Sequence, residues 1–165
     1  MRDGFDDFVR SRSTGLLRVA YLLTGDRHAA EDLLQEVLEQ MYVKWRRIDG
    51  APEAYARRAL VNRSTNRWRR RGRRPEAPLA HHDVAVPDPS EDVITRDAVV
   101  EALRLLPPRQ RAAVVLRYLD DLPIAEVARA LECSEGNVKS STSRGLERLR
   151  AVLAPVTTTT VRGKR

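Results

Sequence analysis

Hydrophobic residues along this chain recur at steps of three and four, the spacing of one face of an α-helix. No segment shows a strand pattern, and no internal repeat appears. Residues 5–23 form the first predicted helix, which Thr24-Gly25 ends. Its apolar positions are Phe5, Phe8, Leu16, Val19, Ala20 and Leu23. The pattern as a whole predicts an all-α protein made of two small helical bundles.

The second predicted helix begins after Asp26, a suitable N-cap, and has two opposite faces. Its broad apolar face consists of Leu34, Val37, Leu38, Met41, Tyr42 and Trp45. The opposite face is a contiguous polar and acidic stripe, made of Asp32, Gln35, Glu36 and Glu39. Taken alone, such a stripe is most simply a solvated helix face.

A third predicted helix starts at Pro52, covers residues 52–74 and is strongly basic. Residues 51–75 contain nine arginines against a single glutamate. The arginines recur every three or four residues, and two asparagines and a tryptophan lie among them. Such a mixture can neutralise phosphates, stack on bases and hydrogen-bond to base edges, so we expect nucleic-acid contact here. The candidate residues are Asn62, Arg63, Asn66, Arg67, Trp68, Arg70 and Arg71.

Residues 76–93 interrupt the helical pattern with three prolines and five acidic residues, and they contain no lysine or arginine. We interpret them as a flexible acidic linker between a domain of residues 1–75 and a domain of residues 94–154. His81 and His82 invite a metal site, but no cysteine and no third histidine lies near them in sequence. An exposed pair is the simpler interpretation. Residues 155–165 are polar and β-branched, which predicts a disordered tail.

The second domain ends in two helices joined by a short turn. Ser90 can cap a helix that continues to Leu106, and Pro107-Pro108 separates it from another that reaches Leu119. A helix over residues 124–131 then precedes Glu132-Cys133-Ser134, and Ser134 can cap the final helix. Short polar and basic side chains at the start of that helix are typical of a DNA-binding helix-turn-helix, although a helical hairpin with a solvated basic face is the alternative. The candidate DNA contacts are Ser134, Asn137, Lys139, Ser140, Ser143, Arg144 and Arg148.

Composition narrows the classes of function. The net charge of +7 and the isoelectric point near 10.3 suit an anionic partner. Cys133 is the only cysteine, which excludes an intramolecular disulfide and a cysteine-based metal site. The charged N-terminus lacks a signal-peptide pattern, and no apolar run is long enough to span a membrane, so we expect a cytoplasmic protein. No nucleophile–base pair, phosphate loop or metal cluster appears, so we expect neither an enzyme nor a cofactor.

Three features follow one another along the chain: a helix with an acidic face, an arginine-rich helix and, beyond a linker, a helix-turn-helix. In this arrangement the chain resembles the bacterial RNA polymerase sigma factors of the extracytoplasmic-function type, within the sigma-70 superfamily, and in detail the SigE-like group of actinobacteria. The segments that carry the resemblance are AAEDLLQEVLEQMY, PEAYARRALVNRSTNRWRRRGRR and LPPRQRAAVVLRYLDDLPIAEVARALECSEGNVKSSTSRGLERLR. They cover most of residues 20–150.

The resemblance implies roles for each set of residues. The acidic stripe would bind core RNA polymerase at the clamp helices of its β′ subunit. The arginine-rich helix would engage the promoter −10 element, with Asn62 near the pocket for a flipped base. The final helix would read the −35 element, and the second domain would meet the β flap. The linker would run towards the RNA exit path.

Two positions depart from the family pattern, because Glu132 replaces a frequent turn glycine and Asn137 stands where threonine is common. Both bear on the −35 sequence preference. The alternative function is a helix-turn-helix regulator that binds duplex DNA without joining the polymerase, which leaves the arginine-rich helix without a role. Whether an anti-sigma factor restrains the protein stays open. We also expect the free protein to hide its DNA affinity, with the acidic linker folded over the basic block and the two domains packed together.

Overall fold

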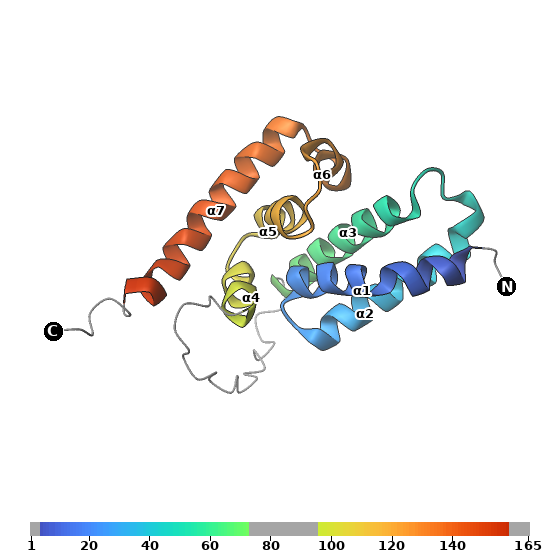
Figure 1. Ribbon diagram of the computed structural model, residues 1–165, viewed down its shortest axis with the longest axis horizontal. Helices are drawn as coiled ribbons and strands as arrows, with labels where there is room; N and C mark the ends of the chain where they lie inside the picture. The colour runs from blue at the N-terminus through green and yellow to red at the C-terminus, as the bar shows by residue number, and fades with distance from the viewer. Residues whose placement is uncertain (1–3, 73–95, 159–165) are drawn as a thin grey trace.

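The computed structural model describes the backbone of residues 4–72 and 96–158, and every element in these ranges is helical (Figure 1). The first bundle contains α1 (Phe5–Thr24), α2 (Arg27–Lys44), the 3₁₀ turn η1 (Trp45–Arg47) and α3 (Pro52–Gly72). The second contains α4 (Arg96–Arg104), α5 (Pro108–Val114), the π-helical turn η2 (Val115–Leu119), α6 (Ile124–Leu131) and α7 (Glu135–Thr158). The predicted all-α class is confirmed.

The ends of α1 and α2 follow the capping chemistry of the sequence. Gly25 takes a left-handed conformation with φ of 74°, and its N–H donates to the carbonyl of Tyr21 at 2.7 Å. Glycine adopts this conformation without the clash that a Cβ causes. The Asp26 carboxylate accepts from the N–H of Ala29 at 3.0 Å, which caps α2. Both helices then bury most of their predicted apolar faces against each other and against α3, whereas Tyr42, predicted on the apolar face of α2, is 44% exposed.

The second bundle depends on a close approach between α5 and α7. A Cβ on Gly145 would lie 2.7 Å from a methyl group of Val114, so only glycine lets the two helices meet at this distance. Val127 of α6 and Val138 of α7 are fully buried in the same core. The core therefore holds the two helices of the predicted helix-turn-helix at a fixed angle.

Two predicted boundaries differ in the structure. The helix that begins at Pro108 does not remain α-helical to Leu119, because a π-helical turn replaces its last part and the N–H of Asp120 bonds to the carbonyl of Val115 at 2.8 Å. The tail was expected to begin at residue 155, but α7 continues to Thr158, since extending a formed helix costs far less than starting one. Residues 1–3, 73–95 and 159–165 lie outside the described part, and with them the linker, Ser90, Ile94, His81 and His82.

The two bundles lie side by side (Figure 1). Helix α3 contacts α5 and α6, and α1 contacts α4, α5 and η2. Helix α7 lies on the side of the second bundle that faces away from α1, α2 and α3 (Figure 1). This arrangement places the basic helix of the first bundle at the contact between bundles and leaves the last helix at the outside.

Candidate nucleic-acid interface

The start of α7 presents the polar surface that its sequence predicts. The N–H of Asn137 donates to the Ser134 hydroxyl at 3.1 Å, so Ser134 caps the helix. Thr142 is buried and donates its hydroxyl to the carbonyls of Val138 and Lys139, both at 2.9 Å. The candidate duplex-binding side chains are all exposed: Ser134, Asn137, Lys139, Ser140, Ser143, Arg144 and Arg148.

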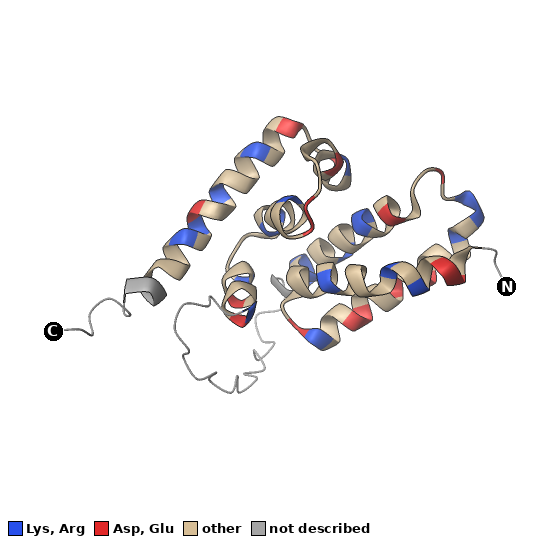
Figure 2. Ribbon diagram, in the orientation of Figure 1, with Lys and Arg blue, Asp and Glu red and all other residues tan. Residues whose placement is uncertain are grey.

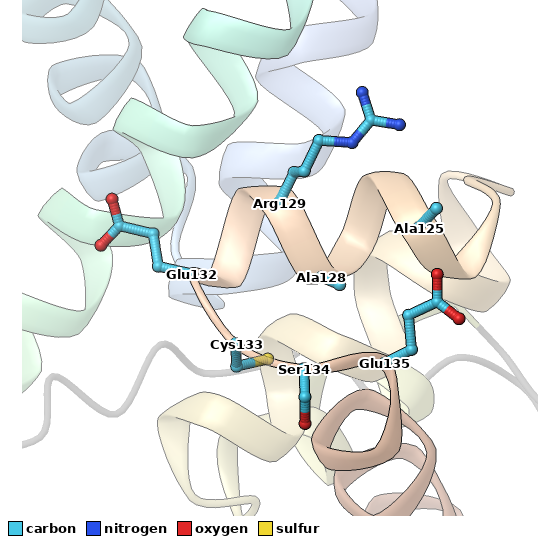
Figure 3. Close-up of a pocket in the computed structure, with 7 residues that line it drawn as sticks. All are labelled: Ala125, Ala128, Arg129, Glu132, Cys133, Ser134 and Glu135. Carbon is cyan, nitrogen blue, oxygen red and sulfur yellow. The ribbon is translucent and has the colours of Figure 1, made fainter.

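Figure 2 shows several basic positions along α7, with acidic ones among them, and the basic side chains of Lys139, Arg144 and Arg148 are exposed. These residues lie on one helix whose start is capped and whose inner side is buried, so their positions are fixed relative to one another. They can therefore contact successive phosphates and base edges along a groove of duplex DNA. Beside them, the turn forms a shallow hollow between α6 and α7 (Figure 3). The hollow is lined by Ala125, Ala128, Arg129, Glu132, Cys133, Ser134 and Glu135.

Glu132 holds the tightest position of the turn. Its φ of 54° is left-handed, a region that glycine or asparagine ordinarily fills. The backbone of the turn therefore has the conformation that a glycine usually adopts, although the residue at this position is Glu132. In Figure 3 this carboxylate points towards α3, and it pairs with Arg58 of that helix.

One face of α3 borders the second bundle. Asn62 and Asn66 line a cleft of about 310 Å³ together with Thr65 and Arg69, and Arg109, Ala112, Leu131 and Glu132 form the opposite wall. The two asparagines were predicted, whereas Thr65 and Arg69 were missed. Positions 62, 65, 66 and 69 have the i, i+3, i+4, i+7 spacing of one helix face. This spacing could have identified Thr65 and Arg69 as neighbours of the two asparagines.

Two arginines of α3, Arg63 and Arg67, lie on another side of the helix and face α2. Arg63 donates to Glu36 at 3.0 Å and to Gln40 at 2.8 Å. Arg67 donates to the second carboxylate oxygen of Glu36 at 2.5 Å and to the carbonyl of Ala29 at 3.3 Å. Both arginines are half-buried, so they are not free extended cations in this state.

The other candidates on α3 are more open. Trp68 is 48% exposed, and Arg70 is exposed as well. Arg71 belongs to the helix, but its side chain lies outside the described residues. Trp68 therefore offers an accessible aromatic face for stacking, and the structure does not bring it together with Asn62 and Asn66 in the cleft.

The predicted acidic stripe of α2 divides into two parts. Asp32, Gln35 and Glu39 are exposed, and the Gln35 amide donates to Glu39 at 3.1 Å. Glu36 instead accepts from the two arginines of α3. The structure therefore joins Glu36, predicted as a polymerase contact, to Arg63 and Arg67, predicted as DNA contacts. Sequence spacing alone does not show this connection.

A buried guanidinium, that of Arg111, stabilises the second bundle where α4 ends. Arg111 is only 8% exposed and donates to the carbonyls of Leu103, Arg104 and Leu106 at the end of α4, and to that of Leu23 in α1. Burial, helped by the nearby Arg104 charge, lowers the pKa of Arg111 below its ordinary value. The side chain joins the two bundles, and no sequence signal identified it.

Other types of site are not seen in the described ranges. No group of three or more histidine, cysteine, aspartate or glutamate side chains within residues 4–72 and 96–158 could hold a metal ion. None of the helices described is long and apolar enough to cross a membrane.

Comparison with known proteins identifies both bundles. Residues 8–74 match the family model described as Sigma-70 region 2, and residues 96–149 match the model described as Sigma-70, region 4. The chain belongs to the sigma-70 family of RNA polymerase sigma factors. Within this family it falls in the extracytoplasmic-function group and is SigE-like, as the sequence predicts.

The relatives agree with this assignment. The chain is 39% identical to the RNA polymerase sigma-E factor of Streptomyces avermitilis, over 90% of this chain and 84% of that protein. It is 36% identical to the extracytoplasmic-function sigma factor SigM of Mycobacterium tuberculosis, over 95% of this chain and 81% of that one. Its fold resembles that of the sigma factor RpoE of Bartonella quintana, solved in complex with the anti-sigma factor NepR, with a TM-score of 0.75 and 24% identity over 91% of this chain and 96% of that chain.

The function follows from the family. This sigma factor directs core RNA polymerase to promoters and assists transcription initiation. The alternative of a helix-turn-helix regulator is not favoured, because the region 2 match covers the basic helix for which such a regulator has no use. Its partners are core RNA polymerase and promoter DNA.

Proposed function

We propose that three surfaces of this sigma factor divide its work. The exposed part of the α2 stripe (Asp32, Gln35 and Glu39) binds the β′ clamp helices of core polymerase. The α3 residues around Asn62 and Asn66 hold unpaired bases of the −10 element, and the start of α7 reads the −35 duplex. The observation that supports this division most directly is that every candidate side chain on α7, and its cap Ser134, is exposed, whereas Val138, Thr142 and Leu149 on the other side of the helix are buried.

The chemistry of each surface suits its assigned role. Amides beside arginines on α3 can hydrogen-bond to base edges and neutralise phosphates, which offsets the few kcal/mol that unstacking a base costs. Lys139, Arg144 and Arg148 on α7 supply the positive charge that duplex phosphates require. The second domain would also rest on the β flap. No catalytic residue is required, because the polymerase forms the phosphodiester bond, and the protein would act in the cytoplasm with the polymerase.

Glu36 has a different role in this proposal from its three neighbours on the stripe. Its carboxylate positions Arg63 and Arg67, so it acts through the DNA-binding helix as well as beside the polymerase surface. An anti-sigma factor that covers one of the three surfaces is a further partner to be tested by affinity capture, given that the Bartonella quintana relative was solved with one.

Run-off transcription with purified core polymerase tests the division. Asp32→Arg with Glu39→Arg should abolish capture of core polymerase while duplex binding persists. Arg144→Ala should weaken the closed promoter complex about tenfold or more, in line with 1–3 kcal/mol for a specific base contact. Asn62→Ala should spare that complex and slow opening, measured by permanganate reactivity of unpaired thymines. Equal weakening of closed complexes by Arg144→Ala and Asn62→Ala would contradict the proposed division.

A further inference from the structure

Helix α2 divides its polar residues between two faces. Gln35 and Glu39, one turn apart, are exposed and bond to each other. Glu36 and Gln40, each one position further along the helix, are half-buried and face α3. The outer pair belongs to the proposed polymerase surface, so the inner pair is available for a different role.

The inner pair holds two arginines of α3. Gln40 accepts from Nε and Nη2 of Arg63, at 3.3 and 2.8 Å, while Nη1 of the same guanidinium donates to Glu36 at 3.0 Å. The other carboxylate oxygen of Glu36 accepts from Arg67, one turn later on α3. The amide of Gln40 also donates to the hydroxyl of Tyr55 at 3.0 Å. We call Glu36, Gln40, Tyr55, Arg63 and Arg67 the α2–α3 network.

The network lies where α3 has no apolar anchor. The first part of this helix buries Ala56, Leu60 and Val61 in the core. Beyond Val61, none of the side chains that the structure describes on α3 is buried. Apolar burial is non-directional, whereas hydrogen bonds require defined distances and angles. The polar bonds of the network therefore fix the second part of α3 against α2.

The rotation of α3 about its axis determines where its asparagines point. Asn62 and Asn66 directly precede Arg63 and Arg67, so each arginine held by α2 fixes the direction of a neighbour about 100° away around the helix. Both asparagines are exposed, on the face assigned to the −10 bases. The bonds do not use all five N–H groups of either guanidinium, so both arginines can also contact a strand phosphate beside those bases.

We infer that Gln40 and Tyr55 are positioning residues for recognition of the −10 element. They act through Arg63, which Gln40 binds and Tyr55 holds in place by its bond to Gln40. The inference rests on the proposed role of Asn62 and Asn66 and goes beyond it, because it assigns part of the base selection to helix α2. This helix binds polymerase with its outer face and sets the angle of the DNA-reading helix with its inner face.

A purely structural role of the network would give a different result. If the network only stabilised the first bundle, its removal would lower the amount of active protein and reduce open complexes equally on every promoter. If it orients the reading face, its removal lets the second part of α3 rotate, and wrong bases are accepted more readily. The base preference at the −10 element therefore separates the two roles.

The test uses the full chain bound to core polymerase and a promoter library in which the −10 and −35 segments are randomised. Heparin-resistant open complexes are recovered and their DNA is sequenced, which reports the base preference at every position. Gln40→Met removes the acceptor for Arg63 at similar side-chain length, whereas Gln40→Glu retains an acceptor. Tyr55→Phe removes a single hydroxyl and keeps the test valid if Gln40→Met folds poorly. Tyr21→Phe, on α1 and outside the network, is the matched control.

Gln40→Met should reduce the preference for the favoured base at one or more −10 positions by about threefold to tenfold, and Tyr55→Phe should act in the same direction but less strongly. Gln40→Glu and Tyr21→Phe should keep the parent preference. The −35 preference and the capture of core polymerase should be unchanged in all four variants. Adding Gln40→Met to Arg63→Met should cause no further loss, because both changes remove the same bonds.

An unchanged −10 preference in Gln40→Met and Tyr55→Phe, with or without a lower yield of open complexes, overturns the inference. Asn62→Ala in the same library separates this failure from that of the proposed function. If Asn62→Ala alters the −10 preference and the network variants do not, only the positioning role is wrong. If Asn62→Ala leaves the preference unchanged as well, the proposed role of α3 is wrong.

Discussion

The buried guanidinium of Arg111 gives the sharpest stability prediction. Its Nε donates to Leu103 at 2.9 Å, its Nη1 to Leu23 at 2.8 Å, and its Nη2 to Arg104 and Leu106 at 3.1 Å each. The last carbonyls of a helix lack intrahelical partners, so the bonds to Leu103 and Arg104 help to cap the end of α4, while the bond to Leu23 reaches α1. Arg111→Met keeps most of the volume and leaves all four carbonyls without this donor.

The magnitude follows from two opposing contributions. A hydrogen bond to a charged group contributes about 1.5–3 kcal/mol, so four such bonds taken separately exceed about 6 kcal/mol. Burying the charge offsets part of this sum, as the lowered pKa of Arg111 indicates, and methionine removes that cost. We expect a net loss of about 3–4 kcal/mol in the free energy of unfolding, a large part of a typical domain's stability of about 5–15 kcal/mol.

Urea unfolding followed by far-UV circular dichroism measures this loss. The matched control is Arg109→Met, two residues earlier on α5, where the exposed side chain makes a single bond to the carbonyl of Leu131 at 3.3 Å. It should cost less than about 1 kcal/mol. An equal, small effect of the two changes would refute the assigned role of the buried guanidinium.

The same comparison has a defined pH dependence. When the folded pKa of a base is lowered, the folded protein gains stability only as the pH rises through that folded pKa towards the unfolded one. Arginine stays protonated in proteins at neutral pH. The difference between Arg111→Met and the parent should therefore stay constant from about pH 6 to about pH 9. A slope in this window would mean that another group titrates with Arg111.

Two further predictions concern the helix-turn-helix. Gly145→Ala places a Cβ 2.7 Å from Val114, so it should destabilise the fold by about 1–3 kcal/mol in thermal unfolding, and adding Val114→Ala should recover much of the loss. Glu132→Gly removes the strain of a left-handed glutamate and should stabilise the second bundle by about 1 kcal/mol. Glu132→Ala keeps a Cβ and should give no such gain. Equal stability of the two variants would show that the turn is unstrained.

Local signals predicted most of the secondary structure. Gly25 and Asp26 end and begin helices through bonds to residues three or four positions away, and Ser134 caps α7 in the same manner. The all-α class, the helix-turn-helix and the family resemblance were predicted and are confirmed. Such features can be predicted from sequence because helical periodicity and capping depend on neighbours along the chain.

The direction of the basic side chains depended on the packing. On α3 almost every face carries an arginine, so the charge pattern could not show that Arg63 and Arg67 turn to Glu36 while Asn62 and Asn66 face the second bundle. The rotation of the helix decides this, and it is determined by the buried residues between the helices. The roles of these side chains in polymerase and promoter binding stay predictions.

Contacts between the bundles had no counterpart in the sequence. Arg58 and Glu132 are far apart along the chain, as are Arg111 and Leu23, and their pairing exists only where the folded bundles meet. Hydrophobic spacing determines which residues are buried within each helix pair, because apolar burial is the dominant and non-directional contribution to folding. Ion pairs and backbone bonds between bundles require specific distances and directions, which only the tertiary structure provides.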